Sequence, residues 1–338
     1  MENCEGNNDF SIQQALLAHC EERRRQISMF IWDTVRGRFK KEGVVIGISG
    51  GIDSAVVATL AAEALGPDRV FGLVLPEKES SPSSRELGID LCRTLEIPHE
   101  EVSITPMLEA LGVYSGKESL TRQVFPRYDP SRHTTSLTRP PVLAAEKIFN
   151  IPSLVLLEDQ VPIATKKLST PQFFQLLSLQ NAKQRTRMIV EYMRAEEMNY
   201  AVCGTTNKTE LLLGFYVRYG DGGVDLEPVA DSYKVQVYGL AELLGIDRRI
   251  VARAPSPDTW SHFTSDEEVA LRIPYDILDQ LLFAEENHLS PEVVQASTGM
   301  DRTQVEWGKK HILGLKNAAR MLEGPPPIGI TDGSERVL

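Results

Sequence analysis

Few cysteines, a shortage of basic residues and the lack of any long apolar run set the first limits on this sequence. Its four cysteines, Cys4, Cys20, Cys92 and Cys203, show no paired spacing, so neither a zinc cluster nor a disulfide framework is indicated. Nowhere do eighteen apolar residues follow one another, and no basic stretch with an apolar run behind it is found near the first residues. We therefore expect no membrane insertion, no secretion and a cytoplasmic location with reduced thiols.

The shortage of positive charge limits the ligands. Thirty-six Lys and Arg stand against 47 Asp and Glu, a net charge of -11 over 338 residues. This balance argues against broad electrostatic binding to nucleic acid or to anionic membranes, although a local basic patch can still face a phosphate. With 42% hydrophobic and 25% charged residues, the chain is typical of a globular protein with a substantial core. A small anionic ligand would need a dedicated pocket.

What is present is an alternation of strand and helix patterns. Residues 1–42 are expected to form a helical lead-in, a single segment from residue 11 onward. The apolar run at 44–48 predicts a strand, which a glycine turn joins to a helix at 54–64. Further strands are predicted at 70–75 and 100–104. This alternation predicts an α/β fold with a doubly wound parallel sheet, in which ligands bind at the carboxyl ends of the strands.

The rest of the chain is divided by an irregular segment. Seven prolines interrupt residues 112–172, which we interpret as an insertion or lid within a domain that spans 43–285. Regular elements are predicted to return as a helix at 181–197, a strand at 200–203, a helix at 235–244 and helices over 275–321. We expect 286–323 to form C-terminal helices and 324–338 to be a loose tail.

The most informative motif follows the first predicted strand and consists of Ser49, Gly50, Gly51, Ile52, Asp53 and Ser54. At this place, the free amides and the dipole of the next helix favour an anion. The glycines let the backbone approach phosphate oxygens, and the serines can donate hydrogen bonds. Asp53 would repel a phosphate unless a magnesium ion lay between them. A tight capped turn is the alternative for an isolated Gly-Gly, but the full motif after an apolar strand favours a phosphate loop.

The loop lacks both the Gly-Lys-Ser/Thr ending of a P-loop and the Gly-x-Gly-x-x-Gly of a dinucleotide fold. It resembles the pyrophosphate loop of the N-type ATP pyrophosphatases, which include the NAD, GMP and asparagine synthetases. Four later motifs occur in the order and spacing of the NAD synthetases: Asn-Ala-Lys-Gln-Arg-Thr-Arg-Met at 181–188, Gly-Thr-Thr-Asn-Lys-Thr-Glu at 204–210, Gly-Phe-Tyr-Val-Arg-Tyr-Gly-Asp-Gly-Gly-Val-Asp at 214–225 and Tyr-Lys-Val-Gln-Val at 233–237. The resemblance covers about 44–111 and 181–279, and it implies an adenine-nucleotide α-hydrolase-like fold.

Several charged residues in these motifs suit a nucleotide site on physical grounds. Asp53 and Glu210 are carboxylates near two strand ends and can hold magnesium against a triphosphate. Lys234 and Arg187 are cations suited to phosphates or to developing charge. Each has a simpler explanation: an arginine on a helix is usually a surface residue, Glu210 can be a helix-start carboxylate, and an Asp-Gly-Gly stretch is usually a hairpin turn.

Position by position, the resemblance implies three groups of site residues. Asp53 and Glu210 would bind Mg²⁺. ATP would contact Ser49, Gly50, Gly51, Asp53, Ser54, Arg187, Thr205 and Ser256. The acyl substrate would face Asp221, Asp225 and Lys234, and the catalytic residues would be Asp53, Lys234 and Asp221.

The chain departs from the family in three places. The usual Gln-Thr-Asp-Glu-x-Glu-Leu-Gly is replaced by the sequence at 262–269, the His-Lys near the C-terminus is not evident, and the insertion at 112–172 is longer than the compact ammonia-dependent enzymes carry. A long insertion beside an active site can bring a new substrate or a lid. We expect it to cover the acyl-substrate side rather than the ATP side.

The resemblance implies an ATP-dependent amide synthetase that adenylates a carboxylate, releases pyrophosphate and transfers the acyl group to ammonia. The expected reaction converts nicotinate adenine dinucleotide to NAD, and the alternative is a paralogue that acts on another carboxylic acid. Because the lead-in is one helical segment, we expect ammonia from solution or from a separate glutaminase, and the family likeness suggests a homodimer. A remote alternative is a helix-turn-helix nucleic-acid module at 290–313. The six histidines show no metal spacing and are expected to be solvent-exposed or capping residues.

Overall fold

The apolar run at residues 44–48 forms the middle of a parallel sheet whose strands, in spatial order, are β3 (His99–Glu101), β2 (Val70–Val74), β1 (Val44–Gly47) and β7 (Ala201–Val202). All three pairings are parallel, which confirms the predicted sheet. The third strand is shorter than predicted and ends at Glu101. The structure is a computed structural model that describes residues 11–144, 152–256, 260, 265–320 and 322. The expectation for 324–338 therefore lies outside the described residues.

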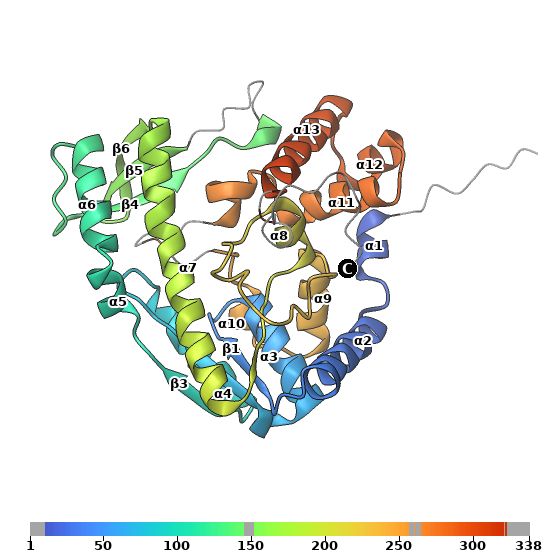
Figure 1. Cartoon of the computed structure of the whole chain (residues 1–338). Helices are drawn as coiled ribbons and strands as arrows, with labels where there is room; N and C mark the ends of the chain where they lie inside the picture. The colour runs from blue at the N-terminus through green and yellow to red at the C-terminus, as the bar shows by residue number, and fades with distance from the viewer. Residues whose placement is uncertain (1–10, 145–151, 257–259, 261–264, 321, 323–338) are drawn as a thin grey trace, which may run out of the picture.

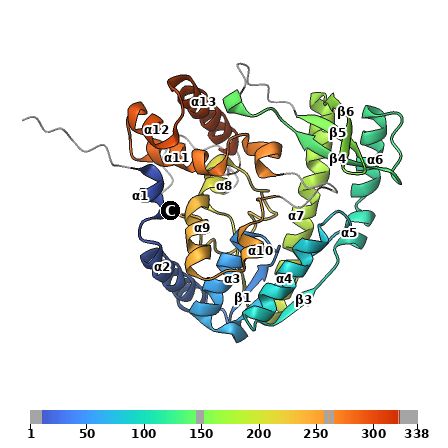
Figure 2. The ribbon, with the colours of Figure 1, turned by 180° about the vertical axis from the view of Figure 1, so that it is seen from behind.

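Helices cover both faces of this sheet, as its doubly wound topology requires (Figures 1 and 2). Side chains alternate across β1, so Val44 and Ile46 enter one apolar cluster and Val45 enters another. The first cluster includes residues of α2 (Cys20–Trp32), α3 (Ile52–Leu65), α4 (Pro82–Thr94) and α9 (Lys234–Leu243). The second includes residues of α5 (Thr105–Ala110), α6 (Val113–Val124) and α7 (Thr170–Met198).

The lead-in is two helices rather than one. α1 (Ile12–Leu17) ends at Ala18, and α2 begins after His19, whose left-handed backbone (φ 65°) turns the chain. α1 packs on the C-terminal helices and α2 packs on α3 and α9. The expectation of a single helical segment was therefore wrong, because periodicity alone does not show a one-residue left-handed break.

The insertion is more regular than its prolines suggested. After α6 it forms an antiparallel sheet of β4 (His133–Thr138), β5 (Ser153–Glu158) and β6 (Val161–Lys167). Its buried side chains, among them Leu120 and Leu154, form a separate apolar cluster together with Leu176 of α7 and Trp260. α7 begins at Thr170, eleven residues earlier than predicted, with Ser169 as its N-cap and a proline in the first turn. A proline at that position favours a helix instead of interrupting it.

A buried ionic cluster ties the insertion to the main sheet. Lys183 of α7 lies 2.7 Å from carboxylate oxygens of Glu77 and of Glu79, and Lys117 of α6 lies 2.6 Å from Glu79. Burial opposes ionisation of Glu79, but the two lysines outweigh it and hold the pKa of that carboxyl below its ordinary value. Because Glu77 and Glu79 follow β2, this cluster fixes α6 and α7 against the carboxyl edge of the sheet.

The C-terminal region is helical, as predicted for 275–321, with α11 (Tyr275–Glu286), α12 (Pro291–Thr298) and α13 (Arg302–Ala319). α12 and α13 have a helix-turn-helix connection, but Val305 and Ile312 of α13 are buried in a cluster with α11. The remaining elements are η1 (Asp33–Arg38), η2 (Pro67–Arg69), η3 (Val142–Ala144), α8 (Lys208–Leu213), α10 (Arg248–Val251) and η4 (Glu267–Leu271). No helix within the described residues combines the length and apolarity needed to cross a membrane.

Candidate active site

A cavity of about 590 Å³ opens at the carboxyl edge of the parallel sheet, where ligands of such sheets bind. One wall is the loop at 49–54, which joins β1 to α3. The opposite wall comes from the insertion and the first half of α7, and includes Leu137, Arg139 and Phe173. The segment between β7 and α8 and the segment at 253–256 complete the lining.

The loop at 49–54 is shaped to leave its amides open. Gly50 has a left-handed backbone (φ 73°), and a Cβ at this position would lie 2.2 Å from the carbonyl oxygen of Ser84, so only glycine fits. The hydroxyls of Ser49 and Ser54 lie 3.1 Å apart, and Ser54 donates to the carbonyl of Gly51. Gly51 is the N-cap of α3 and supplies no side-chain cap. The first amides of α3 therefore remain available to an anion.

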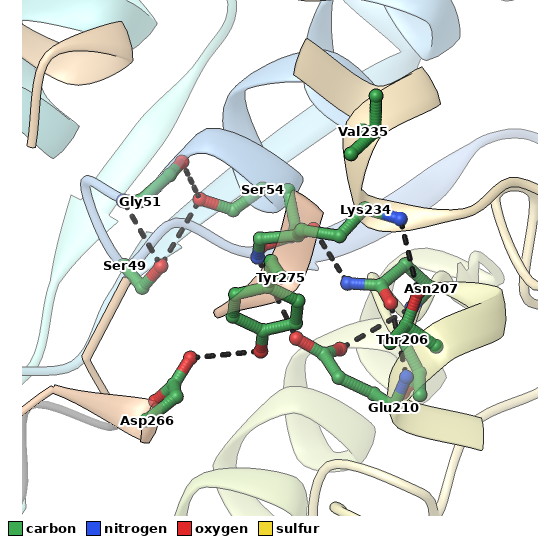
Figure 3. Close-up of polar contacts among 12 residues, drawn as sticks. Ser49, Gly51, Ser54, Thr206, Asn207, Glu210, Lys234, Val235, Asp266 and Tyr275 are labelled. Atoms are coloured by element: carbon green, nitrogen blue, oxygen red, sulfur yellow. Dashed lines mark hydrogen bonds and ion pairs between the residues drawn. The ribbon is translucent and has the colours of Figure 1, made fainter. Parts of the chain in front are cut away.

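Three charged side chains meet beside this loop (Figure 3). The Nζ of Lys234 lies 2.5 Å from Oδ2 of Asp53 and 3.6 Å from Oε1 of Glu210. Asn207 donates through Nδ2 to the other carboxylate oxygen of Asp53, at 3.0 Å. Lys234 is buried, with 1% of its surface exposed. The structure thus brings Asp53, Glu210 and Lys234 together, although they are far apart in sequence.

Local helix chemistry holds these side chains in place. Asn207 and Glu210 form a capping box at the start of α8, so Glu210 is both a helix-start carboxylate and a site residue. Lys234 is the first residue of α9, and its amide donates to the hydroxyl of Thr209. The buried carboxylate of Asp279 accepts from that hydroxyl at 2.5 Å and from the amide of Val235 at 2.7 Å. Asp279 therefore links α8, α9 and α11 behind the site.

The cluster contains more carboxylate charge than the single positive charge of Lys234 can balance. Burial and the nearby Asp53 raise the pKa of Glu210 well above its ordinary value, in spite of Lys234. Burial lowers the pKa of Lys234, but Asp53 and Glu210 outweigh it and the net shift is upward. Burial also raises the pKa of Asp266 to about 6, and Tyr275 donates to this carboxylate at 3.1 Å. Two carboxylates facing a cavity beside a phosphate loop are the donor set that Mg²⁺ prefers, so the residues present fit this ion.

The other predicted nucleotide contacts also lie around the cavity. Thr205, Ser256 and Arg187 belong to its lining, whereas Gly50 does not. Arg187 is held by the carbonyl of Leu75, at 3.3 Å from Nε, and by Gln184, at 2.8 Å from Nη1. Its guanidinium is thereby positioned beside the carboxyl end of β2.

The two predicted acidic contacts to the acyl substrate lie in different places. Asp221 lines the cavity and accepts from the amide of Val217 at 2.6 Å. Asp225 is not part of the lining; its carboxylate accepts from the amide of Val202 at 2.8 Å and from the hydroxyl of Tyr192 at 3.1 Å. Asp225 thus fixes the loop at 221–225 to the edge strand β7.

Sequence reasoning missed several polar residues of the site, namely Asn207, Asp266, Tyr275 and Glu191. The spacing Asn-x-x-Glu is a capping-box signal, so the fixed position of Asn207 was predictable. Glu191 lines the cavity, and burial raises its pKa to about 7. It occupies a helix position at which a charged residue usually faces solvent, so no local signal marks it.

A phosphate-binding loop at the end of a parallel sheet, beside paired carboxylates and a buried lysine, defines a nucleotide-dependent α/β enzyme. The sequence model of the NAD synthase family matches residues 24–124 and 142–314. The chain belongs to this family, whose members are ATP-dependent ligases that form a carbon–nitrogen bond. The NH3-dependent NAD+ synthetase of Mesorhizobium japonicum is 37% identical over 90% of this chain and 96% of its own length. The NH3-dependent NAD+ synthetase of Thermotoga neapolitana is 38% identical over 72% of this chain and 78% of its own length.

Solved structures show the same fold. The NMN synthetase from Francisella tularensis superposes with a TM-score of 0.63 at 22% identity, covering 93% of this chain and 99% of that one. The NH3-dependent NAD synthetase from Campylobacter jejuni, in complex with the nitrate ion, gives a TM-score of 0.58 at 22% identity and covers 92% and 99%. The predicted fold class, with helical additions at both ends, is confirmed.

Proposed function

We propose that this chain is an ammonia-dependent NAD synthetase. The carboxylate of nicotinate adenine dinucleotide attacks the α-phosphorus of ATP and pyrophosphate leaves; ammonia then attacks the acyl carbon and AMP leaves. The observation that carries this proposal is the meeting of Asp53, Glu210 and Lys234 beside the open amides at the start of α3. The relatives named above carry the same activity in their names and match most of this chain.

Each part of the nucleotide wall has a role in this reaction. The loop amides and the hydroxyls of Ser49 and Ser54 bind the phosphates that leave as pyrophosphate, and the dipole of α3 favours their negative charge. Lys234 and Arg187 offset the charge that develops at the α-phosphate. Thr205 and Ser256 complete the ATP contacts. Ser54, Lys234 and Arg187 are held by hydrogen bonds before ATP binds, so little reorganisation of these groups is needed during the reaction.

Asp53 and Glu210 would hold magnesium against the phosphates of ATP. When bound, the ion neutralises the triphosphate and polarises the phosphorus under attack. The raised pKa of Glu210 supports this assignment, because two carboxylates that share one lysine favour an added cation.

The acyl substrate occupies the other side of the cavity, between Asp221 and the insertion. The apolar side chains of Leu137, Phe173 and Trp260 on this wall suit the flat rings of a dinucleotide. Asp225 has a positioning role, since it fixes the loop that carries Asp221. Ammonia enters from solution or from a separate glutaminase.

A homodimer is part of the same proposal. Three apolar side chains on α7 that do not line the cavity are exposed, with exposed fractions of 61% for Phe174, 53% for Ile189 and 59% for Met193. An apolar stripe of this kind on a long helix is typical of an interface between copies of a chain. Met193→Glu should shift the mass measured by light scattering from dimer to monomer, with Arg302→Glu at the exposed start of α13 as a charge control away from α7.

The function is tested with a panel of acids. Purified protein is incubated with ATP, Mg²⁺ and ammonium, together with nicotinate adenine dinucleotide, nicotinate mononucleotide or nicotinate alone, and AMP is followed. AMP release that requires the dinucleotide supports the proposal. Release that requires another acid would favour the paralogue with the same chemistry, and the NMN synthetase of similar fold makes the mononucleotide the first acid to compare.

A further inference from the structure

Two arginines that have no acidic partner in the described part of the chain, Arg139 and Arg272, lie where the insertion and the C-terminal region meet. Arg139 follows β4 and lines the cavity. Arg272 follows η4 and is buried, with 3% of its surface exposed. Three of their nitrogen atoms, Nε of Arg139 and both Nη atoms of Arg272, are buried and have no hydrogen-bond partner.

Both side chains are nevertheless held in place. Arg272 donates through Nε to the carbonyl of Pro140 at 2.8 Å, which leaves its two terminal nitrogens free. The guanidinium of Arg139 lies over the ring of Phe173, 5.5 Å from its centroid. Arg272 also adopts a left-handed backbone (φ 64°), which favours glycine over a long side chain. Backbone strain of this kind is found most often at ligand-binding and catalytic sites.

Among the described residues, no acidic side chain shifts the pKa of either arginine. Neither arginine forms an ion pair within the residues that the structure describes. Burial and Arg272 lower the pKa of Arg139 to about 10, and burial lowers the pKa of Arg272. His311, which is buried rather than solvent-exposed or capping as expected from the sequence, has its Nε2 2.8 Å from the carbonyl of Leu271, and burial together with the charges of Arg272 and Arg139 lowers its pKa. Burying positive charge beside positive charge costs free energy, and an anion that joined the two guanidinium groups would offset this cost.

We propose that Arg139 and Arg272 form an anion-binding subsite that takes a phosphate group of the acyl substrate. This inference rests on the proposed function and assigns the diphosphate of the dinucleotide to the insertion side of the cavity. Guanidinium groups bind phosphate through paired hydrogen bonds, and Arg139 already faces the cavity. The loop at 49–54 supplies a separate phosphate site for ATP on the opposite wall. Arg139 also lies between the two segments that match the family, 24–124 and 142–314, so this arginine belongs to the insertion, whereas Arg272 belongs to the second matched segment and is not part of the cavity lining.

The test compares Arg139→Gln with a matched control, Arg132→Gln. Arg132 precedes the same strand and is exposed, paired with Glu158. Arg139→Gln should raise the KM for nicotinate adenine dinucleotide about 10- to 100-fold, the cost of a charged hydrogen bond. The KM for ATP and kcat should change less than about threefold, and Arg132→Gln should leave all three constants unchanged. An increase in the KM for ATP, or weaker inhibition by pyrophosphate, with an unchanged KM for the dinucleotide would overturn the proposal, because the anion would then come from the nucleotide.

A binding measurement separates this subsite from the proposed function. ADP-ribose carries the diphosphate without the nicotinate carboxylate, and α,β-methylene ATP can occupy the nucleotide side. With that analogue present, wild-type protein should bind ADP-ribose in calorimetry, and Arg139→Gln should bind it at least about tenfold more weakly. Equal affinities would overturn the subsite even if the enzyme makes NAD. Failure of the wild type to make NAD would overturn the function and leave this binding result to decide the subsite. Arg272→Gln should weaken binding similarly; if it fails to fold, Arg139→Gln decides.

Discussion

The two walls of the cavity solve the problem of binding anions in different ways. On the nucleotide wall, charges are arranged among the protein's own groups: Lys234 lies between Asp53 and Glu210, and Asn207 holds Asp53. On the insertion wall, Arg139 and Arg272 are fixed but retain free donors. The first wall is therefore preorganised for chemistry with a metal-bound nucleotide. The second wall carries two positively charged guanidinium groups, and an anionic ligand would supply the hydrogen-bond acceptors that they lack.

The largest expected effect comes from breaking the nucleotide wall. Asp53→Asn and Glu210→Gln should each lower kcat by about 10²–10³, the usual loss when one charge-stabilising group is removed. Glutamine at 210 keeps the capping box, so α8 should persist. The measurements are kcat at saturating Mg²⁺ and the thermal midpoint.

Asp68→Asn is the matched control, since Asp68 is exposed just beyond the far end of α3. It should behave as wild type. Rates near wild type for Asp53→Asn at limiting Mg²⁺ would remove the metal assignment.

The amino-acid sequence predicts the nucleotide wall more completely than it predicts the insertion wall. The loop at 49–54 combines an apolar strand, glycines and a helix start within about twenty residues, so local patterns predict both its structure and its use. The meeting of Asp53 with Glu210 and Lys234 depends on tertiary packing, so local patterns do not predict it. The family resemblance was what assigned these three residues to one site. Arg139 and Arg272 belong to no motif. The sheet of the insertion was not predicted, because prolines that lie between strands give the same sequence pattern as prolines that prevent strands from forming.

A second prediction concerns the separate core of the insertion. Leu154→Ala removes a side chain that is 1% exposed in that core and should cost about 2–5 kcal/mol of unfolding free energy in the region that opens with it. Hydrogen exchange should become faster in β4, β5 and β6 and remain slow in β1 and β2, because the clusters are separate.

The control for this variant is Ile163→Ala on β6, where the side chain is 49% exposed. Its effect should stay within about 0.5 kcal/mol. Equal acceleration of exchange in both sheets would show that the two walls unfold as one unit.

The smallest expected effect is a change in pH dependence behind the nucleotide wall. Burial raises the pKa of Asp279 to about 7, although Thr209 and Val235 donate to it. A carboxyl whose pKa is higher in the folded state contributes stability below its unfolded pKa, near 4, and loses that contribution as the pH rises to about 7. Asp279→Asn should flatten the fall in unfolding free energy between pH 4 and 7, by at most about 1.4 kcal/mol per pH unit.

The exposed Glu285 on the same helix, which pairs with Lys316, provides the control. Glu285→Gln should keep the wild-type slope in denaturant titrations at each pH. A steeper slope in Asp279→Asn than in wild type would contradict the assigned direction of the shift.

The central claim is that this chain joins ammonia to the carboxylate of nicotinate adenine dinucleotide through an adenylate. The most direct measurement is the product stoichiometry with ATP, Mg²⁺, ammonium and the dinucleotide, with nucleotides separated by chromatography and pyrophosphate assayed enzymatically. The account predicts AMP, pyrophosphate and NAD in equal amounts, and no AMP when the dinucleotide is omitted. ADP and orthophosphate as the main products would show an acyl-phosphate route and contradict it.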